Sequence, residues 1–186
     1  MTTSSDGLFV QTAARPLADT LRPHELDAVS GQDHLLGVDG SLRRMVDAAK
    51  SGQPFPSLIF WGSPGTGKTT IARLLADAIG MQFEPVSAVF DGVADLRRIF
   101  ARAKENSTAG LKTLMFVDEV HRFNKAQQDG LLPHVEDGLV TLVGATTENP
   151  SFALNGALLS RCQVMVLNRL DDHALKQIIN RAETHY

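Results

Sequence analysis

The sequence predicts an α/β fold in which helices cover both faces of a five-stranded, mostly parallel sheet. Three observations predict it: short apolar runs alternate with helical patterns, a glycine-rich loop joins one such run to a helix, and another run ends in two carboxylates. This alternation favours parallel strands joined by crossover helices. The chain has 186 residues, 43% of them hydrophobic, which suffices for the core of one domain.

The helices and strands are expected in a fixed order along the chain. An amphipathic helix is predicted over 39–50, because apolar residues recur at i, i+3, i+4 and i+7 from Leu42. Apolar runs predict strands at 57–61, 82–88, 112–118, 139–146 and 163–167. Helical patterns predict helices at 68–79, 93–106, 124–136 and 155–160, and a last one from Leu170 to His185 with Asp171 as its cap.

A phosphate-binding loop is the most informative motif. Gly62 to Thr69 read Gly-Ser-Pro-Gly-Thr-Gly-Lys-Thr, between a predicted strand and a predicted helix. Backbone N–H groups and the positive end of the helix dipole can therefore surround phosphate oxygens. Gly65 and Gly67 allow close approach of the backbone, Lys68 brings a charge to the outer phosphates, and Thr69 offers a hydroxyl to Mg²⁺.

A pair of carboxylates follows the apolar run 113–117, as in a Walker B segment. Asp118 is expected to hold Mg²⁺ through water, and Glu119 to orient and polarise the water that attacks the γ-phosphate. The expected nucleotide is ATP, because Asn124-Lys125-Ala126-Gln127 lacks the aspartate of a guanine-reading Asn-Lys-x-Asp element. ATP hydrolysis is the predicted reaction.

Composition limits the remaining function classes. The formal charge of −3, from 18 basic and 21 acidic residues, is unlike that of an autonomous nucleic-acid binder, so any DNA contact is expected to be local or shared between subunits. The lone Cys162 excludes an internal disulfide and indicates a reducing compartment. No stretch approaches the ~20 apolar residues of a membrane span, and no signal peptide is recognisable, so the cytoplasm is expected.

Several polar side chains outside these motifs are also interpreted. The strand ending in Thr146 and Thr147 is expected to point hydroxyls toward the γ-phosphate, with Thr147 sensing the phosphate state. Arg161 is expected to reach a neighbouring subunit's site and stabilise charge on the phosphoryl group, an effect worth roughly 10³ to 10⁵ in rate. His121 and His134 lack ligand-spaced partners, so we interpret them as structural residues rather than a metal pair.

Five stretches carry a family resemblance: Pro16 to Asp19, Leu21 to Pro23, Gly31 to Leu36, Phe116 to Asp129 and Gly144 to Phe152. They resemble the ATPase domain of the AAA+ superfamily, in its clamp-loader clade. From about residue 15 to 186 the chain is most similar to the replication-associated recombination protein A family. That family is also called MgsA, and its eukaryotic relative is the Werner helicase-interacting protein.

The resemblance implies a DNA-dependent ATPase that acts at stalled forks and at junctions of single- and double-stranded DNA. It implies ATP and Mg²⁺ as cofactors, a ring-like homo-oligomer, partners such as single-strand binding protein, no membrane, and a nucleoid-associated place in the cytoplasm. The catalytic residues it implies are Asp118, Glu119, Thr147 and Arg161. The nucleotide-binding residues it implies are Gly62, Ser63, Pro64, Gly65, Thr66, Gly67, Lys68, Thr69 and Thr70, with Leu21, Arg22, Val29, Gly31 and Gln32 in the adenine pocket.

The expected organisation is a disordered tail over 1–14, an AAA+ core over 15–168, and the first helix of a truncated lid over 169–186. The family's second-sensor arginine and its C-terminal oligomerisation domain are not expected within this sequence, so the chain is expected to be a weakly active fragment. Ser63 and Ser30 depart tolerably from the family pattern. Ala94 replaces the usual lysine, which weakens the case that this segment contacts phosphates.

Three functions stay open at this point. The leading one is the fork-maintenance ATPase. A branch-migration motor would share the phosphate loop, the Gly-Ala-Thr-Thr strand and the trans arginine, and sequence beyond Tyr186 would separate these two. The third is a non-hydrolysing clamp-loader-like adaptor, against which intact Lys68, Asp118 and Glu119 argue.

Overall fold

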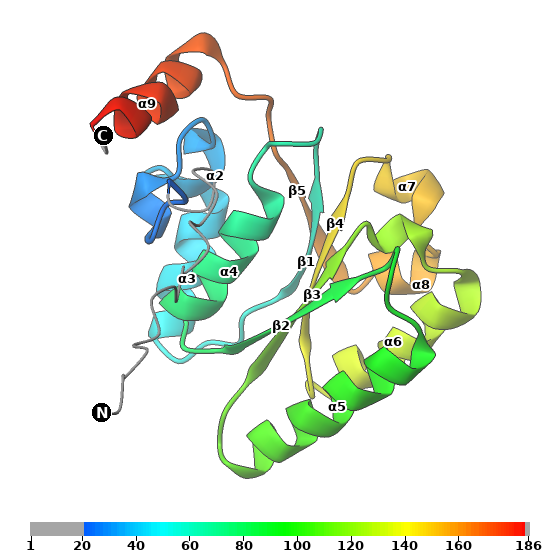
Figure 1. Ribbon diagram of the computed structural model, residues 1–186. Helices are drawn as coiled ribbons and strands as arrows, with labels where there is room; N and C mark the ends of the chain where they lie inside the picture. Colours follow the sequence, from blue (N-terminus) through cyan, green and yellow to red (C-terminus); the bar gives the residue numbers. More distant parts are fainter. Residues whose placement is uncertain (1–20, 185–186) are drawn as a thin grey trace, which may run out of the picture.

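One parallel five-stranded sheet forms the centre of the fold (Figure 1). A computed structural model describes residues 21–184, so the predicted tail over 1–14 lies outside the described residues. The strands are β1 (Ser57–Trp61), β2 (Gln82–Ser87), β3 (Thr113–Asp118), β4 (Thr141–Thr146) and β5 (Cys162–Val166). They pair in parallel in the order β2-β3-β4-β1-β5. The predicted five-stranded α/β fold is confirmed.

Helices cover the sheet on both faces, because successive strand side chains point to opposite sides. On one face, Leu58 and Phe60 belong to the core formed with α3 (Ser41–Lys50) and α4 (Lys68–Ala78). On the other, Ile59 belongs to a core with α5 (Val93–Thr108), α6 (Lys125–Glu136) and α8 (Gly156–Leu159) (Figure 1). The carboxyl ends of the strands are therefore fixed between two packed layers.

Four short helices of the described residues were not predicted, because segments of three or four residues rarely show a helical period. They are the 3₁₀ helices η1 (Leu26–Ala28) and η2 (Val120–Arg122), and the α-helices α2 (Asp33–Leu36) and α7 (Pro150–Ala153). The last helix, α9 (Asp172–Glu183), has the predicted cap: the Asp171 carboxylate accepts the Ala174 N–H at 2.8 Å. In Figure 1, α9 lies near α2, beyond the carboxyl ends of the strands.

The predicted boundaries agree with the structure to within two residues. Strand β4 begins at Thr141 rather than at 139, because the N–H of the buried Val140 donates to the His134 carbonyl at the end of α6 instead of joining the sheet. Helix α5 runs two residues further than predicted, to Thr108. Among residues 21–184, no helix is both long and apolar enough to cross a membrane.

Candidate functional site

The predicted phosphate-binding loop connects the carboxyl end of β1 to the N-terminus of α4. Gly65 and Gly67 have φ of +79° and +94°, in the left-handed region that glycine adopts without a steric penalty. Gly67 is the N-cap of α4, so the unpaired N–H groups of the first helical turn lie at the loop. Ser63 accepts a hydrogen bond through its hydroxyl from Arg169 Nε at 3.1 Å.

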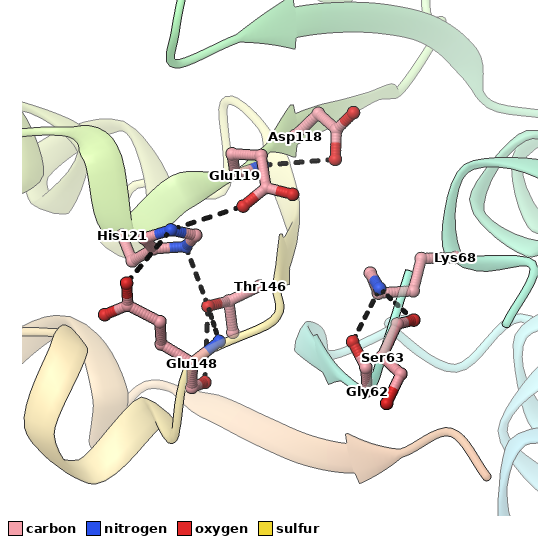
Figure 2. A network of polar contacts seen from close by, with 8 residues as sticks. All are labelled: Gly62, Ser63, Lys68, Asp118, Glu119, His121, Thr146 and Glu148. Carbon is pink, nitrogen blue, oxygen red and sulfur yellow. Dashed lines mark hydrogen bonds and ion pairs between the residues drawn. The ribbon is translucent and has the colours of Figure 1, made fainter. Parts of the chain in front are cut away.

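Lys68 is the first residue of α4, and its side chain folds back over the loop (Figure 2). Nζ donates to the carbonyl oxygens of Gly62 and Ser63 at 2.7 and 2.9 Å. Burial lowers the pKa of Lys68, while the charges of Glu119 and Asp118 oppose that shift. A phosphate anion beside Nζ would offset the same desolvation penalty, so the site favours an anionic ligand.

Two carboxylates face this lysine from the carboxyl end of β3 (Figure 2). Asp118 ends the strand and accepts the Glu119 N–H at 3.1 Å through Oδ1. Glu119 has φ of +52°, a conformation uncommon outside glycine. Its carbonyl accepts the Arg122 N–H at 2.8 Å, which helps to hold the turn. The backbone at Glu119 is thus kept in a strained conformation, as is frequent at functional sites.

A cavity of about 740 Å³ lies between the loop and these carboxylates, within the size range of small-molecule sites. It brings together residues from four separate stretches of the chain. Its walls are formed by Leu21, Arg22, Pro23, Val29, Ser30, Pro64, Gly65, Thr66, Gly67, Lys68, Thr69, Thr70, Asp118, Glu119, Leu170, Ile178 and Arg181. Most predicted nucleotide-site residues therefore share one cavity.

Four predicted nucleotide-binding residues are not in the cavity wall. Two are Gly62 and Ser63, whose carbonyls accept from Lys68 Nζ, and the others are Gly31 and Gln32, contrary to the expectation that Gln32 lies near the base. Gln32 is fully buried. Its Nε2 donates to the Asn168 carbonyl at 2.8 Å and, at 3.4 Å, to the Thr66 carbonyl, and its Oε1 accepts the Asn168 N–H at 3.0 Å. The amide is thus occupied by backbone groups, and Gln32 fastens the phosphate loop to the segment after β5.

Besides Pro23 and Ser30, which are sequence neighbours of predicted residues, three cavity residues were missed from the sequence: Leu170, Ile178 and Arg181. They belong to α9 and the segment leading into it. Arg181 donates through Nη1 to the Ala28 carbonyl at 2.8 Å, which ties α9 to the opposite wall. An apolar face on this helix was recognisable, but nothing in the sequence indicates that the helix folds back against residues 28–30.

The carboxyl end of β4 differs from the prediction. Thr146 is fully buried, and its Oγ lies 2.9 Å from His121 Nδ1. The expectation that its hydroxyl points toward the γ-phosphate is therefore wrong, because Thr146 is fully buried and does not line the cavity. Thr147 is half-buried and follows the last strand residue, outside the residues that line the cavity. Its role as a sensor stays a prediction.

Arg161 lies at the other end of the sheet from the phosphate loop. It borders a second cavity that includes Ser57, the first residue of β1, whereas the loop follows Trp61, the last. Its side chain is 40% exposed and forms an ion pair with Glu136, and Nη1 donates to the Ala157 carbonyl at 2.8 Å. Arg161 is thus separated from the cavity of its own chain.

The two histidines interpreted as structural have different surroundings. His134 stacks on Phe100 with the ring centroids 3.7 Å apart. His121 contacts the Glu119 carboxylate, with Nε2 at 3.2 Å from Oε2. Within the described part of the chain, no group of three or more histidine, cysteine, aspartate or glutamate side chains could hold a metal ion. Burial raises the pKa of Cys162 to about 11, so its thiol stays protonated at neutral pH.

Comparison with known proteins gives the class of this chain. Residues 58–170 match the profile of the ATPase family associated with various cellular activities (AAA). The match spans β1 to β5, and so includes the phosphate loop and both carboxylates. The chain belongs to this family of ATPases.

The similar proteins narrow the class. The chain is 49% identical over 174 residues to replication-associated recombination protein A of Haemophilus influenzae, and 47% identical over 174 residues to that of Escherichia coli K12. Each alignment covers 94% of this chain and 38% of the relative. ATPase WRNIP1 of Dictyostelium discoideum is 42% identical over 173 residues, covering 93% of this chain and 19% of the relative. The resemblance predicted from the sequence is confirmed.

A solved structure supports the fold and its class. The RuvB Holliday junction branch migration motor of Thermotoga maritima matches with a TM-score of 0.72 and 31% sequence identity. The match covers 89% of this chain and 54% of the motor. This chain therefore spans about half of that structure and less than two fifths of the two bacterial relatives.

Proposed function

We propose that this chain binds Mg·ATP and hydrolyses it, as the ATPase unit of a protein that acts at DNA junctions during replication and recombination. The observation that carries the proposal is the convergence of Lys68, Asp118 and Glu119 on one cavity beside the N-terminus of α4. Phosphoryl transfer requires a cation that binds the outer phosphates. It also requires carboxylates that hold a metal ion and orient the attacking water.

Each residue has a proposed role at the bound nucleotide. Lys68 leaves its two carbonyl partners and meets the outer phosphate oxygens, next to the N–H groups of the loop. The Thr69 hydroxyl and the Asp118 carboxylate are oxygen donors suited to Mg²⁺, which usually keeps several waters and phosphate oxygens as its other ligands. When bound, Mg²⁺ neutralises charge on the phosphates. Glu119 orients the attacking water and draws its proton.

The base and the neighbouring subunit complete the proposal. Apolar walls from Leu21, Val29 and Ile178 suit the adenine ring, and Arg22 and Arg181 stand in the same wall. Thr147 is proposed to sense the γ-phosphate. Arg161 is proposed to act in the site of an adjacent copy, since it lies at the amino ends of β1 and β5, at the opposite end of the sheet from its own phosphate loop. The protein would then act as a homo-oligomer. In each copy, residues 15–168 are proposed to form the ATPase core and residues 169–186 the start of a lid.

The names of the relatives support the biological setting. Because those relatives are named for replication-associated recombination, we propose fork and junction DNA as the partner, and single-strand binding protein beside it. The net charge of −3 favours DNA contacts shared among subunits. The proposed compartment is the cytoplasm, at the nucleoid.

One substitution tests the proposed hydrolysis. Glu119→Gln keeps the size of the side chain but removes its ability to draw a proton, so ATP binding should persist while turnover falls by about 10² or more. Turnover and Mg·ATP affinity are measured on the full protein with and without a fork DNA. Turnover that stays at the unsubstituted rate in Glu119→Gln would reject the assignment.

A branch-migration motor is the second candidate, favoured by the likeness to RuvB. The two candidates differ in what DNA does: a motor would move the branch point of a four-way junction in an ATP-dependent way. The ATPase activity of a fork-maintenance protein would be stimulated by junctions of single- and double-stranded DNA, but the protein would not move the branch point. A strand-exchange assay on a mobile four-way junction separates them. The retained Lys68, Asp118 and Glu119 disfavour an adaptor that does not hydrolyse ATP.

A further inference from the structure

A chain of polar contacts, two hydrogen bonds and one ion-pair contact, leads from the carboxyl end of β4 to the Glu119 carboxylate (Figure 2). The Glu148 N–H donates to Thr146 Oγ at 3.0 Å, Thr146 Oγ lies 2.9 Å from His121 Nδ1, and His121 Nε2 lies 3.2 Å from Glu119 Oε2. The His121 side chain is only 4% exposed, so its ring is enclosed where it meets these groups. The roles of the phosphate loop and Asp118 do not account for this histidine.

The partners decide which ring nitrogen of His121 carries the proton. Nε2 faces two carboxylates, Glu119 at 3.2 Å and Glu148 at 3.5 Å, and ionised carboxylates only accept hydrogen bonds. We therefore assign the hydrogen to Nε2 in the neutral ring. Nδ1 then accepts a hydrogen bond from the Thr146 hydroxyl at 2.9 Å, a shorter contact than the 3.3 Å from that hydroxyl to the Glu148 carbonyl, while Thr146 Oγ accepts the Glu148 N–H. With this assignment a donor faces an acceptor at each of the three contacts.

The two carboxylates are not equivalent partners for His121. Glu119 is 33% exposed and follows the strand that holds Asp118, whereas Glu148 is 61% exposed and lies in the loop after β4. The shorter and less exposed contact is the stronger one, because water competes less for it. The strained backbone at Glu119 also limits where its carboxylate can go.

We propose that His121, oriented by the Thr146 hydroxyl, is a positioning residue that holds the Glu119 carboxylate toward the nucleotide cavity. This inference rests on the proposed hydrolysis and adds to it a link between two strands. Thr146 is the residue before Thr147, so a movement of the β4 end reaches Glu119 through one imidazole ring. The carboxylate that activates water is thereby aligned with the end of β4, where the phosphate sensor is proposed.

The test compares substitutions at both ends of the ring. His121→Leu removes both ring nitrogens, and Thr146→Val keeps the shape of the side chain without the hydroxyl. Each should lower kcat by about ten- to a hundredfold, by analogy with the loss of a group that orients a metal ligand. Mg·ATP affinity should change less than about threefold, because neither side chain lines the cavity. His121→Gln, whose amide can donate from a similar position, should recover part of the rate.

Two matched variants serve as controls. His134→Gln removes a histidine of α6 that stacks on Phe100 and should leave kcat unchanged. Glu148→Gln removes the weaker carboxylate partner and should lower kcat far less than His121→Leu. A loss of kcat in Glu148→Gln equal to that in His121→Leu would overturn the proposal. The ring would then act by holding the loop after β4 through Glu148, not by positioning Glu119.

A readout without nucleotide tests the contact directly. Nitrogen-15 NMR of the imidazole should show a proton on Nε2 and an accepting Nδ1 for His121, and Glu119→Gln should shift the Nε2 signal. An Nδ1-protonated ring, or an Nε2 signal indifferent to Glu119→Gln, would overturn the proposal. Absence of hydrolysis in the unsubstituted protein would reject the proposed function, whereas full kcat in both His121→Leu and Thr146→Val would reject this inference alone.

Discussion

Replacing Gln32 by leucine should destabilise the protein, because it removes hydrogen bonds that no other group can supply. The side chain is fully buried and bonds both backbone groups of Asn168, at 2.8 and 3.0 Å. A third contact, to the Thr66 carbonyl, is longer at 3.4 Å. Leucine fills a similar volume, so the effect comes from the polar groups that lose their partners.

The magnitude follows from the two short bonds. A buried group left without its partner costs about 1–3 kcal/mol, and water reaching the exposed residue 168 reduces that, so the two groups together give ~2–4 kcal/mol. A chain of this size loses roughly 2–4 °C in unfolding temperature per kcal/mol, which gives roughly 4–16 °C.

Thermal unfolding followed by circular dichroism measures this shift. Gln53→Leu is the matched control, because Gln53 is an exposed glutamine between α3 and β1, and it should leave the unfolding temperature unchanged. An unchanged unfolding temperature in Gln32→Leu, with a lowered ATP affinity instead, would refute the reasoning. It would place the amide at the adenine base.

Three other substitutions probe separate parts of the structure. Gly62→Ala should weaken ATP binding and lower the unfolding temperature, because its Cβ would lie 2.5 Å from the Leu167 carbonyl oxygen. Calorimetry measures the binding and thermal unfolding the stability. The control is Gly156→Ala, whose Cβ would have open space around it. Asp171→Ala removes the cap of α9 and should cost about 1 kcal/mol, or roughly 2–4 °C, in thermal unfolding; no shift would mean that α9 does not need its cap. Arg161→Ala should keep ATP affinity but lower the turnover of the assembled protein by roughly 10³. Glu136→Ala, which removes the ion-pair partner of Arg161, should leave turnover unchanged. Equal turnover in both variants would exclude the trans role.

The sequence was sufficient for the sheet and the phosphate site, because both depend on local patterns. Apolar runs of five or six residues bounded by turns predicted the strands. The phosphate loop was predictable because Gly62 to Thr69 form one contiguous motif, in which the order of the residues defines the site. Asp118 and Glu119 reach the same cavity because parallel strands place their carboxyl ends at one edge.

What the sequence did not predict depends on contacts between distant segments. Gln32 bonds residues 34 and 136 positions away in sequence, and no local pattern distinguishes this from contact with a base. The Thr146 hydroxyl contacts His121, which the sequence analysis interpreted as a structural residue because it lacks ligand-spaced partners. Arg181 reaches Ala28 only because α9 folds back. Such pairings arise from packing, which periodicity does not describe.

Titration calorimetry with Mg·ATP tests most directly whether the cavity at β1 and α4 is a nucleotide site. The unsubstituted chain should bind, and Lys68→Ala should weaken binding by about two orders of magnitude, since a charge-assisted contact is worth up to ~3 kcal/mol. Lys50→Ala removes an exposed lysine at the end of α3 and should bind as the unsubstituted chain does. Equal Mg·ATP affinity in Lys68→Ala and Lys50→Ala would contradict the assignment of this cavity to ATP.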